Sequence, residues 1–520
     1  MKITDLVSFK NEELTDFSLK ENAEAMRLAL KKRRKTLGKH QDICIDGKEE
    51  VTEKCITSVN PANIKEVIGT VGSASAEQAH RAIELSHKKF SEWKYSSLEE
   101  RVQLLLKTAS LMRERKNDIS ALMVLEVGKS WAEADADSAE AIDFLEYYAR
   151  QALRLDQPEE LVPLSGEENV LSYIPLGVGV VIPPWNFPFA ILAGMTSAAL
   201  VCGNTVVLKP SSDAPMIAAE FVNLITEAGI PEGVLNFCPG GGSEIGDVLV
   251  DHPQTRFISF TGSKEVGLRI VERAARPHKD QIWIKRVVAE MGGKDSIVVD
   301  EDVDIESVVE GTLAAAYGFS GQKCSACSRV IVHEKIYDKF LQRLVEVAKE
   351  KISVGDVEGN NCYMGAVSSA QAYKSILNYI EIGKKEGRLM VGGGAVGIKG
   401  WFIEATIFAD VSPEAIISLE EIFGPVLAVI KCADFSEALT IANNTNYGLT
   451  GAVYSNNAEH VQRAKKEFHV GNLYINRKCT GALVGAHPFG GFNMSGTDSK
   501  AGGYDYLHQF SQAKLISKKI

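Results

Sequence analysis

Short apolar runs alternate with longer helical patterns through the middle of this chain. Strand-like runs rich in valine and isoleucine lie at residues 178–182, 205–208, 234–237 and 256–260. Helix-like periodicity fills the intervals between them, at residues 189–201, 214–228 and, more briefly, 244–250. Strands that alternate with helices in this way are typical of βαβ units on a parallel sheet. The pattern predicts an α/β fold.

A second series of the same kind begins after the break at Gly292-Gly293. Its expected elements are a strand, a helix, a strand and a long amphipathic helix, at residues 295–299, 305–317, 329–332 and 335–352. The uncharged stretch 187–208 is long enough to imitate a membrane span. Pro188 would open a helix there and Gly203 would end it, so a buried helix followed by a buried strand is the better interpretation.

Composition narrows the class of protein. A chain of 520 residues with 45% apolar and 24% charged residues is expected to form two or three globular domains. The net charge of −11 argues against a nucleic-acid partner. Nine scattered cysteines do not resemble a disulfide framework, and the first residues lack a signal or transit pattern. We therefore expect a cytoplasmic protein without a nucleic-acid or membrane partner.

A small polar loop carries two cysteines, Cys324 and Cys327, between a predicted helix and a predicted strand. A thiolate attacks carbonyl carbon readily, and Lys323 or Arg329 would favour the ionised form. Buried structural cysteines, a redox CxxC pair and half of a zinc site are the alternatives. No second CxxC or HxxxH spacing accompanies the loop, so no metal is expected.

Two further polar residues stand at the ends of strand-like runs. Glu290 precedes Gly292-Gly293 and could act as a general base for water, although a surface salt bridge is the commoner role for such a glutamate. Asn186 lies in a turn with three prolines, which could fix its amide as a donor to an oxyanion. A stiff structural turn with Trp185 as packing is the alternative there.

Phosphate and ribose contacts are suggested by two other strand ends. Thr261-Gly262-Ser263 joins a strand to a helix start, where backbone N–H groups can bind pyrophosphate, although the spacing is not GxGxxG. Lys209, followed by Ser211 and Ser212, could hold ribose hydroxyls. A solvated lysine would be the more ordinary explanation.

Taken together, these stretches resemble the aldehyde dehydrogenase superfamily, in matching order across almost the whole chain. Besides the turns already described, the resemblance is carried by residues 290–293, 321–324, 421–425 and 488–492. It implies a Rossmann-like cofactor domain, an α/β catalytic domain and a small oligomerisation extension. The boundaries it implies are 1–48 for an N-terminal helical extension, 49–160 and 175–291 for the cofactor domain, 292–475 for the catalytic domain, and 161–174 with 476–520 for the extension.

The resemblance also implies roles for individual residues. Cys324 would attack the aldehyde, Asn186 with the Cys324 N–H would hold the oxyanion, and Glu290 would activate the water that hydrolyses the thioester. The implied cofactor is NAD. Its expected contacts are Trp185, Lys209, Ser211, Ser212, Gly242, Thr261, Gly262, Ser263, Gly292, Glu421 and Phe423. Many NAD-preferring relatives have glutamate where Ser212 stands, so some tolerance of NADP is expected.

Within the superfamily the chain most resembles the glutamate-semialdehyde branch, through residues 134–146, 282–286 and 480–503. In that branch the N–H groups of a loop, here at Gly481-Ala482, bind the substrate's α-carboxylate. The remaining implied substrate contacts are Phe187, Lys323, Ser325 and Phe489. Tyr504 departs from the proline expected at its position. A homo-oligomer, a dimer or a multiple of dimers, is also implied by the resemblance.

Three alternatives stay open at this stage. Another semialdehyde, such as succinate semialdehyde, could be the substrate. A relative that forms acyl-CoA is disfavoured because Glu290 is present to activate water. A protein that keeps the fold without turnover is disfavoured because Cys324, Glu290 and Asn186 are all in place.

Overall fold

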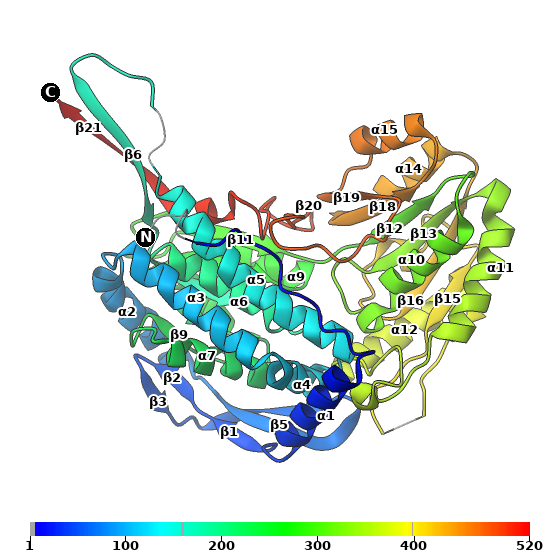
Figure 1. Cartoon of the computed structure of the whole chain (residues 1–520), viewed down its shortest axis with the longest axis horizontal. Helices are drawn as coiled ribbons and strands as arrows, with labels where there is room; N and C mark the ends of the chain where they lie inside the picture. Colours follow the sequence, from blue (N-terminus) through cyan, green and yellow to red (C-terminus); the bar gives the residue numbers. More distant parts are fainter. Residues whose placement is uncertain (1–5, 158–160, 398) are drawn as a thin grey trace.

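The computed structural model describes residues 6–157, 161–397 and 399–520. Two seven-stranded sheets, each covered by helices, form two bodies that lie side by side (Figure 1). This is the predicted α/β fold. Residues 1–5 of the predicted N-terminal extension and residues 158–160 at the end of the predicted 49–160 segment lie outside the described residues.

The sheet of the first body has the strand order β11-β10-β7-β8-β9-β2-β3, and its first five strands are parallel. Four of these strands confirm the predicted βα series. The bounds are β2 (Ile43–Ile45), β3 (Lys48–Glu50), β7 (Val178–Ile182), β8 (Thr205–Leu208), β9 (Leu235–Phe237), β10 (Thr255–Thr261) and β11 (Arg286–Glu290).

Helices pack on both faces of this sheet. Ser75 and Ser97 each form a capping box that begins a helix, α2 and α3 respectively. The helix α6 is apolar on every side and almost wholly buried, which accounts for the uncharged stretch. The bounds are α2 (Ala76–Trp93), α3 (Leu98–Glu114), α4 (Lys116–Val127), α5 (Trp131–Leu155), α6 (Ala190–Val201), α7 (Pro215–Ala228), α8 (Asp247–Asp251) and α9 (Lys264–Ala274). Among the described helices, none is both long and apolar enough to cross a membrane.

The second body is built on the sheet β14-β15-β16-β13-β12-β18-β19, parallel except where β14 meets β15. The predicted second series is confirmed in this body. Its strands are β12 (Asp295–Val299), β13 (Cys327–His333), β14 (Arg388–Val391), β15 (Thr406–Ala409), β16 (Val426–Cys432), β18 (Thr450–Tyr454) and β19 (Asn472–Ile475). Its helices are α10 (Ile305–Tyr317), α11 (Glu334–Lys351), α12 (Ala370–Glu386), α13 (Ile416–Leu419), α14 (Phe435–Asn443) and α15 (Ala458–Glu467).

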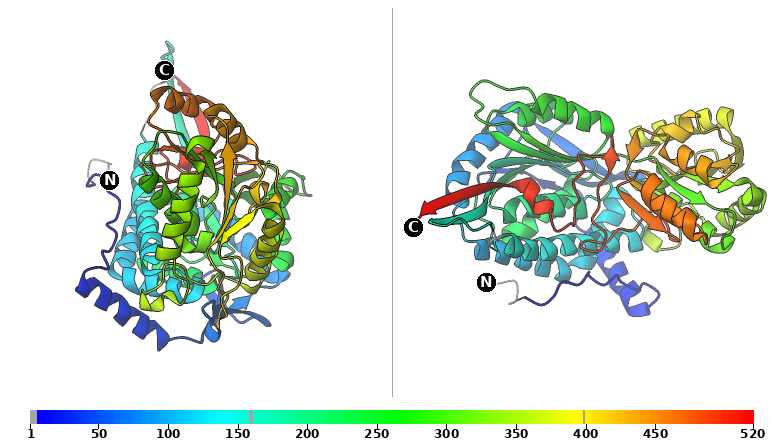
Figure 2. Two further views of the ribbon diagram at one scale, coloured as in Figure 1. Left: turned by 90° about the vertical axis from the view of Figure 1, so that its right-hand side faces the viewer. Right: turned by 90° about the horizontal axis from the view of Figure 1, so that it is seen from above.

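Smaller elements surround the two bodies. A three-stranded sheet has the order β1-β5-β4, β17 pairs with β20, and β6 pairs with β21 along a ribbon that projects from the first body (Figures 1 and 2). These elements are α1 (Lys20–Arg34), β1 (Lys39–Gln41), β4 (Lys54–Asn60), β5 (Asn63–Ser73), β6 (Glu167–Pro175), β17 (Tyr447–Gly448), β20 (Phe492–Asn493) and β21 (Ser511–Lys519).

The structure departs from the sequence predictions at two places. Among the described residues 6–48, α1 is the only helix, and Ile43 and Ile45 are buried as part of β2 in the first sheet. The alternation of Ile43, Cys44 and Ile45 is a weak strand signal, because it covers three residues. The helix expected at 244–250 begins as a π-helical turn at Gly242–Gly246 and continues as α8. The other domain boundaries remain predictions.

The C-terminal tail returns from the second body to the first (Figure 1). Gly496 forms an isolated bridge with Glu290, and Phe489 forms one with Ala501. Tyr504, the departure noted in the sequence, is exposed beside the guanidinium of Arg154, which lies 4.9 Å from the centre of its ring. A 3-10 helix at Tyr506–Phe510 follows, so the tail keeps an ordered course through this position.

Candidate active site

A tight turn places Cys324 between the two bodies. The turn is the 3-10 segment Gly318–Gly321, in which Phe319 and Ser320 both have positive φ. Gly321 also has positive φ, and a Cβ there would lie 2.3 Å from the carbonyl oxygen of Gly424. The Ser320 hydroxyl donates to the Gly365 carbonyl over 2.9 Å. These constraints fix the loop and leave Cys324 half-buried at its end.

The charge around Cys324 differs from the sequence prediction. The Lys323 ammonium lies 2.6 Å from the Glu133 carboxylate, and the Arg329 guanidinium donates to three backbone carbonyls. Neither cation is therefore arranged to hold a thiolate, and that prediction was wrong. Burial raises the pKa of the Cys324 thiol, and the carboxylates of Asp295, Glu421 and Glu290 add to the shift. The protein environment therefore favours the thiol over the thiolate.

Asn186 lies against the loop that carries the cysteine. Its Nδ2 atom donates to the carbonyl of Gln322, two residues before Cys324, over 3.1 Å, and its side chain is buried. An amide nitrogen carries two hydrogens, so one remains for another acceptor. The turn before α6 therefore holds an amide donor against the loop that carries Cys324, and its role at an oxyanion stays a prediction.

A buried ion pair supports this turn, and sequence reasoning missed it. The Lys129 ammonium lies 2.8 Å from Asp137 Oδ2, and neither side chain has any exposed surface. Asp137 Oδ1 also accepts from the Ala190 N–H over 2.6 Å, at the start of α6. The same ammonium lies 4.0 Å from the ring centre of Phe187. The pair thus contacts the chain directly after Asn186, at Phe187 and at the start of α6.

Lys129→Met is expected to destabilise the protein by about 3–5 kcal/mol, because it leaves the buried Asp137 carboxylate without its partner. The measurement is urea unfolding followed by circular dichroism. Arg343→Ala, which removes the exposed pair with Glu306, is the control and should change the transition little. A Lys129→Met transition as close to wild type as the control's would contradict the assignment.

Glu290 ends β11 and points into the C-terminal tail. Ser499 Oγ donates to Glu290 Oε1 over 2.7 Å, the Gly491 N–H donates to Oε2 over 3.4 Å, and the residue is 8% exposed. A Cβ on Gly490 would lie 3.0 Å from Oε1, so a side chain there would crowd the carboxylate. Burial raises the pKa of Glu290 to about 8, and the two hydrogen bonds oppose the shift. The structure thus rules out the surface salt bridge considered from the sequence.

The expected cofactor residues gather at one edge of the first sheet, because the carboxyl ends of its parallel strands lie together. Asn186, Lys209, Thr261 and Glu290 follow or end β7, β8, β10 and β11. The Ser263 hydroxyl accepts from the Val266 N–H and caps α9. Trp185, Ser211, Ser212 and Gly262 belong to the turns at the same edge, and Gly242 opens the π-helical turn after β9.

Two ionisable groups at this edge are buried. Lys209 Nζ donates to the Pro210 carbonyl over 3.2 Å, and burial lowers the pKa of this lysine to about 8. Glu421 accepts from the Gly293 N–H over 3.0 Å, next to Gly292, and burial raises its pKa to about 7. Phe423, which has positive φ, packs edge-on against Trp185 with ring centres 5.5 Å apart. Because Lys209 is buried, the solvated lysine considered from the sequence is wrong.

The predicted anchor loop lies next to the cysteine loop. Cys479 Sγ donates to the carbonyl of Ser325 over 3.5 Å, which joins the two loops directly. Gly481 has positive φ and Ala482 follows it with a half-buried side chain. Arg477 donates to the Thr480 and Gly481 carbonyls, so the carbonyl side of the loop is already bonded. Phe489 is half-buried, with its N–H and carbonyl paired to Ala501.

Comparison with known proteins agrees with this arrangement. A model of the aldehyde dehydrogenase family matches residues 48–516, so the chain belongs to that family. The superfamily and the fold predicted from the sequence are thereby confirmed.

Individual relatives show which members of the family this chain is similar to. The chain is 56% identical over 517 residues to the 1-pyrroline-5-carboxylate dehydrogenase of Bacillus cytotoxicus, which covers 99% of this chain and 100% of that protein. The crystal structure of 1-pyrroline-5-carboxylate dehydrogenase from Thermus with bound NAD matches with a TM-score of 0.97 at 50% identity, over 99% and 100% of the two chains. The NAD complex of betaine aldehyde dehydrogenase from Staphylococcus aureus matches at 0.88 and 31%, over 95% and 97%.

Proposed function

We propose that this chain catalyses the NAD-dependent oxidation of L-glutamate 5-semialdehyde, which is in equilibrium with 1-pyrroline-5-carboxylate, to L-glutamate. The observation that carries the proposal is the direct contact between the cysteine loop and the Gly481-Ala482 loop. It joins the loop that carries the candidate nucleophile to the loop that carries the candidate carboxylate anchor. The full-length similarity to 1-pyrroline-5-carboxylate dehydrogenases supports the same substrate, as used in proline and arginine catabolism.

The residues at the edge of the first sheet fit a dinucleotide. Buried Lys209 has one hydrogen-bond partner, a carbonyl, and buried Glu421 accepts one N–H, so both can still bind ribose hydroxyls. Ser263 and the first turn of α9 suit the pyrophosphate. NAD bound there supplies a hydride acceptor. Ser212 offers no carboxylate to repel a 2′-phosphate, so we expect some use of NADP.

The proposed chemistry proceeds through a covalent thioester. The Cys324 thiol gives its proton to solvent and the thiolate attacks the aldehyde carbon, while Asn186 Nδ2 and the Cys324 N–H hold the oxygen that becomes negative. After hydride loss the acyl group remains on sulfur. Glu290 then takes a proton from the water that attacks the thioester, which releases glutamate and restores the thiol.

The Gly481-Ala482 loop would select the substrate. Its N–H groups suit the α-carboxylate, with the Ser325 hydroxyl beside them, and Phe187 and Phe489 would flank the aliphatic stem. Lys323 is the remaining proposed substrate contact, and its ammonium also pairs with Glu133. Succinate semialdehyde, the runner-up substrate, has no amino group and its carboxylate is one carbon nearer to the aldehyde, so it cannot reach the loop in the same way.

Steady-state kinetics with the two aldehydes tests the proposal. The kcat/KM for glutamate semialdehyde should exceed that for succinate semialdehyde by at least about a hundredfold, since unpaired anchor groups cost binding energy. Equal or reversed values would overturn the substrate assignment. Product analysis without CoA should give free acid, whereas a strict requirement for CoA would overturn the hydrolytic step.

Ser499→Ala is expected to shift the pH dependence of turnover upward. The Ser499 hydrogen bond lowers the pKa of Glu290, so its loss raises that pKa further and leaves less ionised base at neutral pH. Turnover at pH 7 should fall about three- to tenfold and recover in alkaline buffer. Ser495→Ala is the control, since that hydroxyl accepts from the Gly448 N–H instead. An unshifted profile in Ser499→Ala would contradict the assignment.

We also propose a homo-oligomer in the cytoplasm, a dimer or a multiple of dimers. The ribbon formed by β6 and β21 extends beyond the body of the chain, and Val170, Leu515 and Ile516 are exposed on it. A two-stranded ribbon with exposed apolar side chains gains stability when another subunit covers it. The nine free cysteines are consistent with a reducing compartment.

A further inference from the structure

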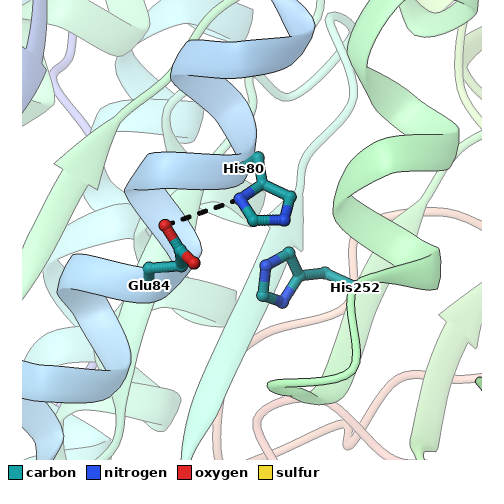
Figure 3. A group of neighbouring side chains, drawn as sticks. All are labelled: His80, Glu84 and His252. Atoms are coloured by element: carbon teal, nitrogen blue, oxygen red, sulfur yellow. Dashed lines mark ion pairs between the residues drawn. The ribbon is translucent and has the colours of Figure 1, made fainter. Parts of the chain in front are cut away.

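Three potential metal ligands meet on the outer side of the first body. His80 and Glu84 lie one turn apart on α2, and His252 follows the end of α8. One ligand atom from each lies within 4.8 Å of the others, and the His80 Nδ1 atom is 3.5 Å from Glu84 Oε2 (Figure 3). Within the described residues, this is the one group of three His, Cys, Asp or Glu side chains whose ligand atoms lie this close together.

The buried member of the group has a ring nitrogen without a partner. His252 is 5% exposed, and its Nε2 atom is buried without a hydrogen bond. Figure 3 shows this ring turned toward His80 and Glu84, and the two imidazole centres are 4.4 Å apart. A buried nitrogen without a hydrogen bond is unfavourable, and a bound ion would satisfy it.

We propose that His80, Glu84 and His252 bind Zn²⁺, with water as the fourth ligand. Two imidazoles and a carboxylate are ligands that zinc takes readily, at about 2.0–2.2 Å. His80 and Glu84 are exposed on one face of α2, so their side chains can rotate toward His252, which the fold holds in place. The sequence search for HxxxH missed the group because residue 84 is a glutamate and the second histidine is residue 252.

The hydrogen bonding of His252 sets the expected strength of the site. Its Nδ1 atom accepts from the Gln254 N–H over 3.1 Å, so the proton of the neutral ring stands on Nε2. Zinc at Nε2 moves that proton to Nδ1 and breaks the bond to Gln254. A metal-bound imidazole usually gains strength by donating from its other nitrogen, and this ring lacks such an acceptor. Micromolar affinity is therefore expected.

The position of the site decides what the ion would do. His252 precedes β10, whereas the Thr261-Gly262-Ser263 turn follows it, so the zinc site and the proposed cofactor edge lie at opposite ends of that strand. Seven residues of strand span roughly 20 Å at about 3.3 Å each. The ion would join α2 to the segment between α8 and β10. It should raise the melting temperature without taking part in the chemistry.

Zinc titration by calorimetry, with anomalous diffraction from a zinc-soaked crystal, tests the proposal. Wild type should show an anomalous peak among the three side chains, and His252→Ala and Glu84→Gln should each weaken this binding by at least about tenfold. Zinc on Cys324 would appear as a separate peak. Glu84 is exposed, so Glu84→Gln gives an answer even if His252→Ala fails to fold.

His40→Ala provides the matched control. His40 and Asp42 form an exposed histidine–carboxylate pair, with His40 Nε2 and Asp42 Oδ1 3.2 Å apart, outside the three-residue group. This variant should keep both the zinc affinity and the zinc-dependent rise in melting temperature. A crystal without a peak among His80, Glu84 and His252, or equal affinity in wild type and Glu84→Gln, would overturn the proposal.

Discussion

Cys324→Ala is expected to abolish NADH formation, with a loss of at least about a thousandfold in kcat. No other described thiol shares its position, since Cys327 is buried and donates to the Arg329 carbonyl over 3.3 Å. Alanine keeps the Cβ atom of the loop residue while it removes the sulfur that would form the thioester. The measurement is absorbance at the NADH band with glutamate semialdehyde as substrate.

Cys327→Ser is the matched control for this variant. Serine can still donate to the same carbonyl, so activity should stay within a few-fold of wild type. Bound NAD should protect wild type and Cys324→Ala from thermal unfolding equally, which separates loss of chemistry from loss of fold. Activity that persists in Cys324→Ala and disappears in Cys327→Ser would transfer the nucleophile to Cys327.

Glu290→Gln should separate hydride transfer from thioester hydrolysis. The first turnover should still release one NADH per chain, because Cys324 and Asn186 are unchanged. Steady-state turnover should fall about 10²- to 10⁴-fold, since glutamine cannot take a proton from water. Rapid mixing that follows NADH absorbance gives both quantities in one experiment.

The pH dependence gives a second readout for the same residue. The base must be ionised to act, and burial raises the pKa of Glu290 to about 8. Steady-state turnover of wild type should therefore rise with pH through about 8 and then level off. This rise should disappear in Glu290→Gln. Loss of the first NADH burst in Glu290→Gln would place Glu290 in acylation instead, and an unchanged pH profile would show that another group titrates.

The order of elements was accessible from the sequence because local patterns report local structure. The alternation of apolar runs gave β7, β8, β10, β12 and α10 within a residue or two of their bounds. The strand β2 was missed because three residues provide little periodicity. Its place beside β9 is decided by a pairing of residues nearly two hundred positions apart.

Charges around the site were harder to predict. Lys323 neighbours Cys324 in sequence, yet its ammonium pairs with Glu133, which lies on α5. The Lys129–Asp137 pair likewise carried no signal, since a lysine and an aspartate eight residues apart are usually solvated. Which cation meets which anion depends on how helices pack, and helix packing is set by contacts distant in sequence.

The sequence by itself determined the α/β class, the residues that resemble a catalytic set and the strand ends on which they stand. The tertiary structure decided that Glu290 is buried against the tail, that the Lys323 ammonium pairs with Glu133, and that Ser325 touches the loop before Gly481. The physical reason is that residue identity and the periodicity of apolar residues are encoded along the chain. Burial and pKa depend instead on the groups that folding brings together.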